Sequence, residues 1–541
     1  MRCGGRRSTM LHPFLGMDVP WLLRNQALRH GDHPFLIWEP FDGRTKVMGY
    51  AAFRQRCVDL AAAMARRGVR PGQHVLVHLD NCPEALLAWY ACAELGAVAV
   101  TTNTRSALPE LRYYVADSGA VAAVTQPRYA ELVNEAAPEL RWLAVTAHDA
   151  GEPLMPGQAP ARGDSFDALL AEGADAAPPR RAPDPSPPVA IQYTSGTTAR
   201  PKGVVWTHAN ALWGARVNAA HERLHPDDVH HVVLPLFHAN AMAYSVLAAL
   251  WAGATAVLQP RFSSSRFWGA ALKHRTTFAS LAPFCLKALL NVETPARHSL
   301  RLIGLGRSDP AAAARLGVGI VSWWGMTETI SHAILGDPEL TSAGAIGRPA
   351  PEYGVHVLRG DGSPVGPGET GDLLITGVPG VSLFLEYLNN PAATADSYDA
   401  AGRLRTGDRV TLLEDGCIRF ADRAKDMLKV GGENVASSEI EAVIAAVPGV
   451  REVAVVAKRH PMLDEVPVAF VLFHRDPPGG VEEVEVMARI HAACATHLAD
   501  FKRPVEVRVL EEFPRSVLEK VAKAELRRLV ETGTRPRPSS P

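Results

Sequence analysis

Hydrophobic and polar positions alternate along the chain with two periods, one typical of amphipathic helices and one of short buried strands. Residues 51–68 have apolar spacing that suits a helix, 73–79 form a short apolar run that predicts a strand, and 84–96 return to helical spacing. Repeated alternation of strands and helices favours parallel sheets covered by helices. The pattern therefore predicts an α/β fold.

The alternation pauses in a polar stretch and then resumes. Between about residues 150 and 188 the composition shifts to Pro, Ala and charge, as in APPRRAPDPSPP, which predicts a solvated linker or loop. The pair Arg180–Arg181 in it is interpreted as serving solubility alone. The elements predicted next are strands at 189–194, 229–237, 254–260 and 276–283, and helices at 241–253 and 263–274.

After about residue 420 the pattern changes. Residues 425–435 predict two short strands around a Gly-Gly hairpin turn. The elements that follow are a helix at 437–447, strands at 451–459 and 466–473, and a long amphipathic helix at 481–498. These elements suffice for a compact α+β unit of about the minimum independent size. The tail GTRPRPSSP, residues 533–541, is predicted to be disordered.

Composition narrows the class of protein. A chain of 541 residues is too long for one ordinary core, and 47% hydrophobic with 21% charged residues is typical of soluble globular proteins. A net charge of −1 provides no field that would recruit nucleic acid or an anionic membrane. The seven scattered cysteines include no Cys-x-x-Cys pair, which favours a reducing compartment over disulfides or structural zinc.

No segment predicts membrane insertion or secretion. The longest apolar run, residues 246–258, is shorter than the roughly 18 residues that a spanning helix needs. The opening MRCGGRRSTM lacks the apolar core of a secretory signal; a weak organelle presequence and an upstream start codon are the two alternatives. We expect a cytoplasmic protein without an integral membrane segment.

The stretch TSGTTARPKGV, residues 194–204, predicts an anion-binding loop that is not a Walker A loop. Gly196 and Lys202 have the Walker separation, but Pro201 replaces the second glycine and Gly203 replaces the magnesium-binding hydroxyl. A flexible surface loop is the alternative. The groups suited to phosphate are the hydroxyls of Thr194, Ser195, Thr197 and Thr198, the backbone at Gly196 and the charge of Lys202.

This stretch also resembles the phosphate-loop signature of the adenylate-forming superfamily, which includes acyl-CoA synthetases, luciferases and peptide-synthetase adenylation domains. Further segments resemble that family's motifs and occur in the same order: PLFHANAM (235–242), WWGMTET (323–329), RTGD (405–408), DRAKDMLKVGGENV (422–435) and PRSVLEKVAKAELR (514–527). The resemblance covers the chain from about residue 18. The segments RFSSSRFWGAALKH (261–274), GVSLFLEYLNNPAATA (380–395) and DEVPVAFV (464–471) are similar to the carnitine and crotonobetaine CoA ligase branch.

The resemblance implies a fold, a reaction and a set of ligands. It implies a large N-terminal domain of packed α/β subdomains and a small mobile C-terminal α+β domain. The expected divisions are a flexible N-terminus (1–17), an adenylation domain (18–424), a lid domain (425–532) and a tail (533–541). A small-molecule carboxylic acid would react with ATP and Mg²⁺ to give an acyl-adenylate and pyrophosphate, and CoA would then take the acyl group. A homodimer is left open.

The resemblance assigns a role to each matching residue. Lys520 would bridge carboxylate and phosphate during adenylation, Glu328 would bind Mg²⁺, and Thr327 would donate to the α-phosphate. The remaining nucleotide-site positions are Asp408 at the ribose, Arg423 at ribose and phosphate, Trp324 beside adenine where the family usually has Tyr, and Gly325 with Met326. Read alone, Lys520 could be an exposed helix lysine and Asp408 part of an ordinary turn.

Other matching residues belong to the acyl pocket and the lid. His238 and Trp323 match the acyl pocket, although a tryptophan in the core is the competing interpretation of Trp323. The lid positions are Lys425 at the hinge, Lys429 in the second half-reaction, and Gly431 with Gly432 where pantetheine would pass. The pair His230–His231 lacks other metal ligands and is interpreted as structural.

Two departures keep other functions open. The family's Ser-Gly-Gly-Ala-Pro run is reduced to Gly304-Leu305-Gly306, and Glu519 stands where Gly is common before Lys520. Together they motivate a catalytically silent relative that acts as a binding protein. An acyl-AMP ligase that loads a carrier protein is the other alternative. A stand-alone acyl-CoA ligase fits the chain best, with either a betaine-type or an apolar acid as substrate.

Overall fold

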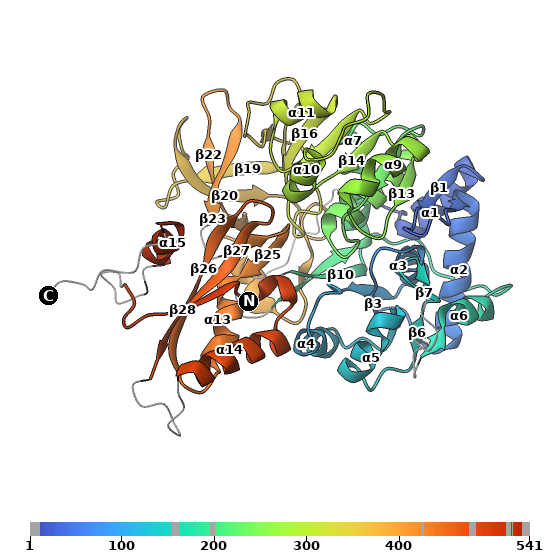
Figure 1. Ribbon diagram of the computed structural model, residues 1–541. Helices are drawn as coiled ribbons and strands as arrows, with labels where there is room; N and C mark the ends of the chain where they lie inside the picture. The colour runs from blue at the N-terminus through green and yellow to red at the C-terminus, as the bar shows by residue number, and fades with distance from the viewer. Residues whose placement is uncertain are drawn as a thin grey trace, which may run out of the picture.

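The computed structural model describes residues 11–153, 163–178, 180–194, 201–423, 427–474, 483–514, 521 and 523–532. A large N-terminal body of helices and sheets carries a small C-terminal domain on one side, so that α14 of the small domain lies beside α4 of the body (Figure 1). The α/β architecture predicted from the sequence is confirmed.

The first sheet of the body has nine strands in the described part of the chain, and its inner strands are parallel. Its edge strands β2, β17 and β18 run antiparallel. In order across the sheet the strands are β18 (Arg348–Pro349), β17 (Ile334–Leu335), β16 (Gly319–Trp324), β15 (Leu302–Leu305), β14 (Phe278–Ser280), β12 (Val229–Val232), β13 (Thr255–Leu258), β1 (Pro34–Trp38) and β2 (Lys46–Gly49).

The second sheet has eight strands among the described residues. Its order is β21 (Glu386–Tyr387), β11 (Lys202–Thr207), β10 (Pro188–Thr194), β4 (Val98–Thr101), β3 (His74–His78), β5 (Ala122–Thr125), β6 (Leu143–Val145) and β9 (Asp164–Ser165). Strand β3 lies between β4 and β5, so the chain turns to opposite sides of β3 in successive crossovers. In open α/β sheets such a switch point, at the carboxyl ends of the strands, is where ligands bind.

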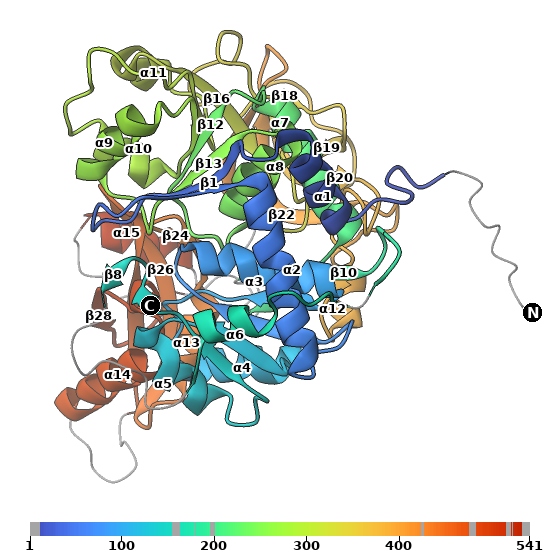
Figure 2. The same cartoon turned by 90° about the vertical axis from the view of Figure 1, so that its right-hand side faces the viewer.

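Helices cover both sheets, and α2 and α3 lie side by side across the body (Figure 2). Within α3 every residue except Glu84 and Glu94 is buried, because its sequence is apolar on all sides. The helices of the body are α1 (Val19–His30), α2 (Tyr50–Arg66), α3 (Pro83–Leu95), α4 (Leu108–Ser118), α5 (Pro127–Ala136), α6 (Phe166–Glu172), α7 (His208–His221), η1 (Asn240–Leu247), α8 (Ala248–Ala252), α9 (Ser264–His274), α10 (Pro283–Leu289), α11 (Pro310–Leu316) and α12 (Pro391–Asp396).

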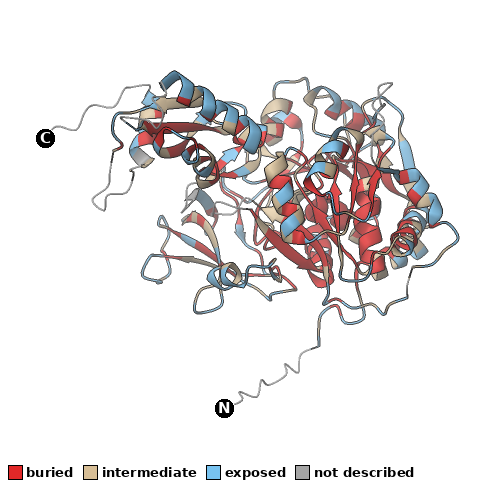
Figure 3. Ribbon diagram, turned by 90° about the horizontal axis from the view of Figure 1, so that it is seen from below, coloured by how far each residue is buried: buried red, intermediate tan, exposed pale blue. Residues whose placement is uncertain are grey.

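Two antiparallel units complete the chain. A four-stranded sheet of the described residues, β19 (Gly354–Leu358), β20 (Thr370–Thr376), β22 (Leu404–Leu412) and β23 (Ile418–Arg423), ends the N-terminal body. The small domain consists of β24 (Met427–Val430), β25 (Glu433–Ala436), α13 (Ser437–Ala445), β26 (Val450–His460), β27 (Asp464–Phe473), α14 (Glu483–His497), η2 (Asp500–Lys502), β28 (Glu506–Val509) and α15 (Lys523–Thr532). The strands of the two large sheets form the buried centre of the molecule (Figure 3).

Three details differ from the sequence predictions. Residues 150–188 are not all linker, because α6 packs Phe166 and Leu169 into the core. Arg181 does more than provide solubility: its guanidinium pairs with Asp18 at 2.8 Å and donates to a carbonyl of α3. The helix predicted at 241–253 begins as a π-helix, η1, and becomes α-helical only at α8. Widened turns of this kind occur frequently at functional sites.

Candidate functional site

A cavity of about 2310 Å³ lies between the N-terminal body and the small domain. Every predicted site residue whose side chain the structure describes lines it: Thr194, Lys202, His238, Trp323, Trp324, Gly325, Met326, Thr327, Glu328, Asp408, Lys429, Gly431 and Gly432. The structure thus brings together positions that are separated by more than two hundred residues in sequence. Ser195, Gly196, Thr197, Thr198, Lys425 and Lys520 lie outside the described residues, and so does the side chain of Arg423, whose backbone pairs with Asp408.

Trp324 and Asp408 form the first fixed contact in the cavity. Trp324 ends β16, and its indole Nε1 donates a hydrogen bond of 2.8 Å to Oδ2 of Asp408 on β22. Both residues are buried, with 8% and 6% exposure. The backbone N–H of Asp408 donates to Oγ1 of Thr406 at 3.1 Å, which fixes the backbone from which the carboxylate extends. The indole therefore holds one carboxylate oxygen in a fixed orientation. A carboxylate fixed in this way is suited to accept hydrogen bonds from the hydroxyl groups of a ligand.

Glu328 sits at the turn after β16, where its carboxylate is 5% exposed. The hydroxyl of Tyr387 donates to Oε1 of Glu328 at 2.8 Å, and Nζ of Lys202 lies 4.6 Å from the centre of the Tyr387 ring. Burial and the neighbouring carboxylate raise the pKa of Tyr387, so it stays a hydrogen-bond donor. Tyr387 thus links Lys202 to the carboxylate of Glu328, and the sequence motifs did not identify it.

The backbone of this turn is held from both sides. Nε1 of Trp206 donates to the carbonyl of Thr327 at 2.9 Å, and the N–H of Phe384 donates to the carbonyl of Glu328 at 2.8 Å. Ile330 follows with φ of 60°, a conformation that is strained for a β-branched residue. Such strain costs about 1–3 kcal/mol and persists only where the surroundings fix it. The turn is therefore a pre-organised part of the site.

Aromatic side chains form the wall at the Trp323 end of the cavity. The indole of Trp323 stacks on the imidazole of His332, with ring centres 4.1 Å apart and an interplanar angle of 11°. Tyr244, from η1, meets Trp323 edge-on at 6.1 Å and 79°. Burial lowers the pKa of His332 well below its usual value, so a neutral ring supports Trp323.

Gly304 makes this arrangement possible. A methyl group at Gly304 would lie 1.7 Å from the Trp323 ring, so only glycine fits beneath the indole. Gly304 belongs to the shortened segment that departs from the family pattern. Trp323 lines the cavity and is also part of the buried core, so both interpretations of it hold.

The small domain contributes a second wall. The hairpin between β24 and β25 turns at Gly431 and Gly432, whose φ values of 57° and 91° require glycine, and Gly432 faces Phe284. Directly after it, Oε1 of Glu433 lies 2.9 Å from Nε2 of His238, across the two domains. His238 is 38% exposed, and that exposure is to the cavity that it lines.

This ion pair shifts both of its groups. Burial alone would lower the pKa of His238, but the Glu433 carboxylate raises it above the usual 6.5. Burial alone would raise the pKa of Glu433, but His238 lowers it. Both shifts favour the charged pair, which connects the loop of His238 to the small domain.

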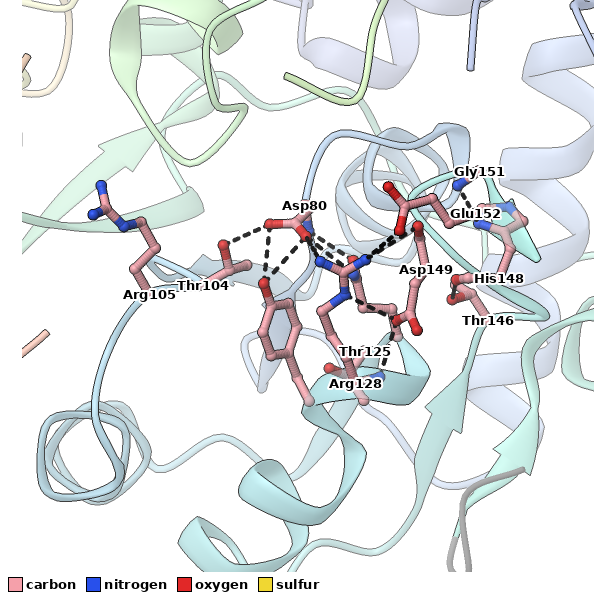
Figure 4. Close-up of polar contacts among 12 residues, drawn as sticks. Asp80, Thr104, Arg105, Thr125, Arg128, Thr146, His148, Asp149, Gly151 and Glu152 are labelled. Carbon is pink, nitrogen blue, oxygen red and sulfur yellow. Dashed lines mark hydrogen bonds and ion pairs between the residues drawn. The ribbon is translucent and has the colours of Figure 1, made fainter. Parts of the chain in front are cut away.

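A cluster of polar side chains at the switch point of the second sheet lines the cavity, and Figure 4 shows the contacts within it. Asp80 follows β3 and accepts hydrogen bonds from Thr104 at 2.7 Å and from Tyr129 at 3.1 Å. Arg128 lies among three carboxylates, with Asp149 at 3.3 Å, Glu152 at 3.5 Å and Asp80 at 3.9 Å. Their mutual contacts tie together the loops that follow β3, β4 and β5.

The model of the AMP-binding enzyme family matches residues 23–388, and that of the AMP-binding enzyme C-terminal domain matches 439–520. The chain belongs to the AMP-binding enzyme family. A crotonobetaine/carnitine–CoA ligase of Escherichia coli O7:K1 (strain IAI39 / ExPEC) is 33% identical to this AMP-binding enzyme over 516 residues, covering 92% of this chain and 96% of the ligase.

Solved structures of acyl-CoA ligases have the same fold as this chain, and two structures of one synthetase superpose on it to different degrees. A double mutant of o-succinylbenzoate CoA synthetase from Bacillus subtilis, bound with a product analogue, has a TM-score of 0.80 at 26% identity and covers 94% of this chain and 98% of that one. The same synthetase in complex with AMP has a TM-score of only 0.65 at 26% identity, with 93% and 97% covered.

These matches confirm the acyl-CoA ligase interpretation. This AMP-binding enzyme is an ATP-dependent acid–CoA ligase that forms an acyl-adenylate and then a CoA thioester. ATP and CoA are its co-substrates. In the described part of the chain, none of the helices combines the length and the apolar character that crossing a membrane requires.

Proposed function

We propose that this enzyme activates a short carboxylic acid that bears a quaternary ammonium group, of the crotonobetaine or carnitine type. The observation that carries the proposal is the corner that Trp323 and Tyr244 form in the cavity wall, with rings at 79° and centres 6.1 Å apart. Both rings line the cavity, and aromatic side chains attract a cation that lacks hydrogen-bond donors. The 33% identical relative is a ligase of crotonobetaine and carnitine.

Nearby carboxylates add to this preference. Burial, and after it the charges of Glu328 and Glu222, raise the pKa of Tyr244, which means that both carboxyl groups act on the same corner. Glu222 is fully buried, and burial raises its own pKa well above the usual value. Because this shift favours the neutral acid at Glu222, the carboxylate of Glu328 is the group that would attract a bound cation.

We assign the first half-reaction to the nucleotide end of the cavity. Asp408, with one oxygen held by Trp324, would accept the ribose hydroxyls, and Thr327 and Lys202, which line the same cavity, would contact the phosphates. Lys520, assigned by its motif, would bridge the acid and the α-phosphate. Arg423 and the segment Thr194–Thr198 complete the proposed nucleotide site by the same resemblance.

We propose Glu328 as the protein ligand of Mg²⁺. Its buried carboxylate, oriented by Tyr387, is the kind of oxygen donor that Mg²⁺ prefers, with nucleotide phosphates as the other ligands. The ion would neutralise charge on the phosphates. No set of three His, Cys, Asp or Glu side chains suited to a metal occurs among the residues that the structure describes, in keeping with a metal shared with substrate.

The second half-reaction is proposed for the arrangement of domains seen here. Gly431 and Gly432 border the cavity beside His238, and Lys429 lines it from the same hairpin, as a passage for the thiol arm of CoA requires. The better match to a product-analogue complex than to an AMP complex of the same synthetase supports this assignment. Lys425 as the hinge follows from the resemblance alone.

Location and assembly stay predictions. The six described cysteines are buried and unpaired with one another, which supports a reducing compartment such as the cytoplasm. The homodimer and the domain divisions after residues 17, 424 and 532 also stay predictions.

The test is product analysis with a matched set of acids. Purified enzyme is incubated with Mg-ATP and CoA and with crotonobetaine, carnitine, crotonate, or longer and aryl acids, and the products are identified by mass spectrometry. We expect crotonobetainyl-CoA, AMP and pyrophosphate, with little thioester from crotonate, which lacks only the trimethylammonium group. A Lys520→Ala variant should form no adenylate. Equal or better turnover of crotonate would contradict the cationic substrate.

A further inference from the structure

Beside the cavity, the small domain and the N-terminal body meet through two crossed ion pairs. Nε of Arg105, in the body, donates to Oδ1 of Asp500 at 2.8 Å, and Nζ of Lys502 pairs with Glu110 of the body. Phe501, between the two small-domain residues, lies under the Arg105 guanidinium at 4.6 Å. Each domain thus presents one acid and one base, so only one register matches all four charges.

Lys502 is the buried centre of this contact. It is 5% exposed, and its ammonium group binds Oε1 of Glu439 at 2.7 Å in addition to the carboxylate of Glu110. Burial alone would lower the pKa of Lys502, but the two carboxylates raise it, so the lysine is charged. A buried charge of this kind needs its partners, because removing one leaves an uncompensated ion.

The side of the contact in the N-terminal body is rigid. Oε2 of Glu110 accepts the N–H of Ala107 at 2.7 Å, which caps α4 and fixes the carboxylate. The loop before α4 is held by the hydrogen bond from Thr104 to Asp80, within the polar cluster shown in Figure 4, while Arg105 points away from that cluster. Glu110 and Arg105 are therefore presented from a fixed surface.

Of the three charged groups in the buried cluster, Lys502 and Glu439 belong to the small domain and Glu110 belongs to the body. Glu439, on α13, and Lys502 both belong to the small domain, so their contact persists wherever that domain lies. Glu110 belongs to the body, so its contact with Lys502 exists only in the arrangement seen here. That arrangement resembles a product-analogue complex more closely than an AMP complex. The Glu110 contact is thus specific to one position of the small domain.

We propose that Glu110 and Lys502 are positioning residues that dock the small domain for thioester formation. They touch no reacting atom. They act by favouring the domain position in which Gly431 and Gly432 border the cavity. Weakening the contact shifts the population away from that position and slows only the step that needs it.

The test compares the two half-reactions in Glu110→Gln. Adenylation is followed by pyrophosphate–ATP exchange, and thioester formation by the single-turnover reaction of enzyme-bound acyl-adenylate with CoA, using crotonobetaine or whichever acid of the panel gives the fastest exchange. Glutamine keeps the cap on α4, since Gln also serves in a capping box. The control is Glu135→Gln, which breaks a surface pair with Arg112 of α4, 2.9 Å long, that does not involve the small domain.

We expect thioester formation to slow about tenfold in Glu110→Gln while exchange stays within about twofold, as for a coupling of ordinary size. Lys502→Gln supplies the same comparison if Glu110→Gln does not fold, and the double variant should lose less than the product of the two single losses. Equal loss in both half-reactions, or an unchanged rate of thioester formation, would overturn the proposal.

Discussion

The hydrogen bond between Trp324 and Asp408 gives the sharpest prediction about nucleotide binding. Replacing Trp324 by Phe keeps an aromatic ring but removes the indole N–H that holds Oδ2 of Asp408 at 2.8 Å. Hydrogen bonds to charged groups contribute about 1.5–3 kcal/mol, and both residues are buried, which keeps the bond from solvent competition. If about 1.4 kcal/mol of this free energy serves to orient the carboxylate for the ribose, nucleotide binding to Trp324→Phe is about tenfold weaker than to wild type.

The assay is calorimetric titration with AMP, supported by the KM for ATP in pyrophosphate exchange. Trp268→Phe is the matched control, because Trp268 is also buried, with 6% exposure, and its Nε1 has no hydrogen-bond partner among the described residues. We expect the AMP dissociation constant to rise about tenfold in Trp324→Phe and to stay unchanged in Trp268→Phe. Equal AMP affinity in both variants would refute the role of the indole N–H.

Two further predictions concern the carboxylates at the cavity. In Tyr387→Phe, Glu328 loses a donor at 2.8 Å; we expect pyrophosphate exchange to slow about tenfold and the apparent Mg²⁺ requirement to rise, measured by magnesium titration. The Glu433 carboxylate raises the pKa of His238 above its usual 6.5. The ion pair therefore stabilises this arrangement of the domains fully below pH 6.5, and this stabilisation is lost as the pH rises through the raised pKa. The ratio of the thioester-forming rates of wild type and Glu433→Gln should therefore fall above pH 6.5, whereas a constant ratio would exclude this role.

Much of the architecture is predictable from local patterns. Elements with a strong local signal are predicted well, because their formation depends on few distant contacts. Examples are the apolar runs of the strands at 73–79 and 189–194 and the turn residues Gly431 and Gly432 of the hairpin. The helix α6 is harder to predict, because it is short and stands in a Pro-rich context where only Phe166 and Leu169 pack inward. Its burial depends on tertiary contacts that no local window contains.

The same limit applies to the site. The motifs locate Glu328 and Asp408, but they assign no role to Tyr387, which reaches Glu328 because β21 pairs with β11. The packing of Gly304 beneath Trp323 joins two strands, and sequence alone shows only a shortened segment there. Arg181 likewise looked like a solvated charge, although it is paired with Asp18.

The docking contact is the least predictable feature. Glu110 and Lys502 are 392 positions apart in the sequence, and each has the spacing of an ordinary helix or turn residue. A lysine in a polar segment is most often exposed, so its burial between two carboxylates has no sequence signal.

The most direct test of the proposed function is the ratio of kcat/KM for crotonobetaine to that for crotonate, in wild type and in Trp323→Leu. Cation–π contacts in a desolvated site contribute up to about 2 kcal/mol, so we predict a preference of about tenfold or more for crotonobetaine in wild type. In Trp323→Leu the ratio should fall toward one. A wild-type ratio near or below one, or a preference that survives the loss of Trp323, would contradict the account.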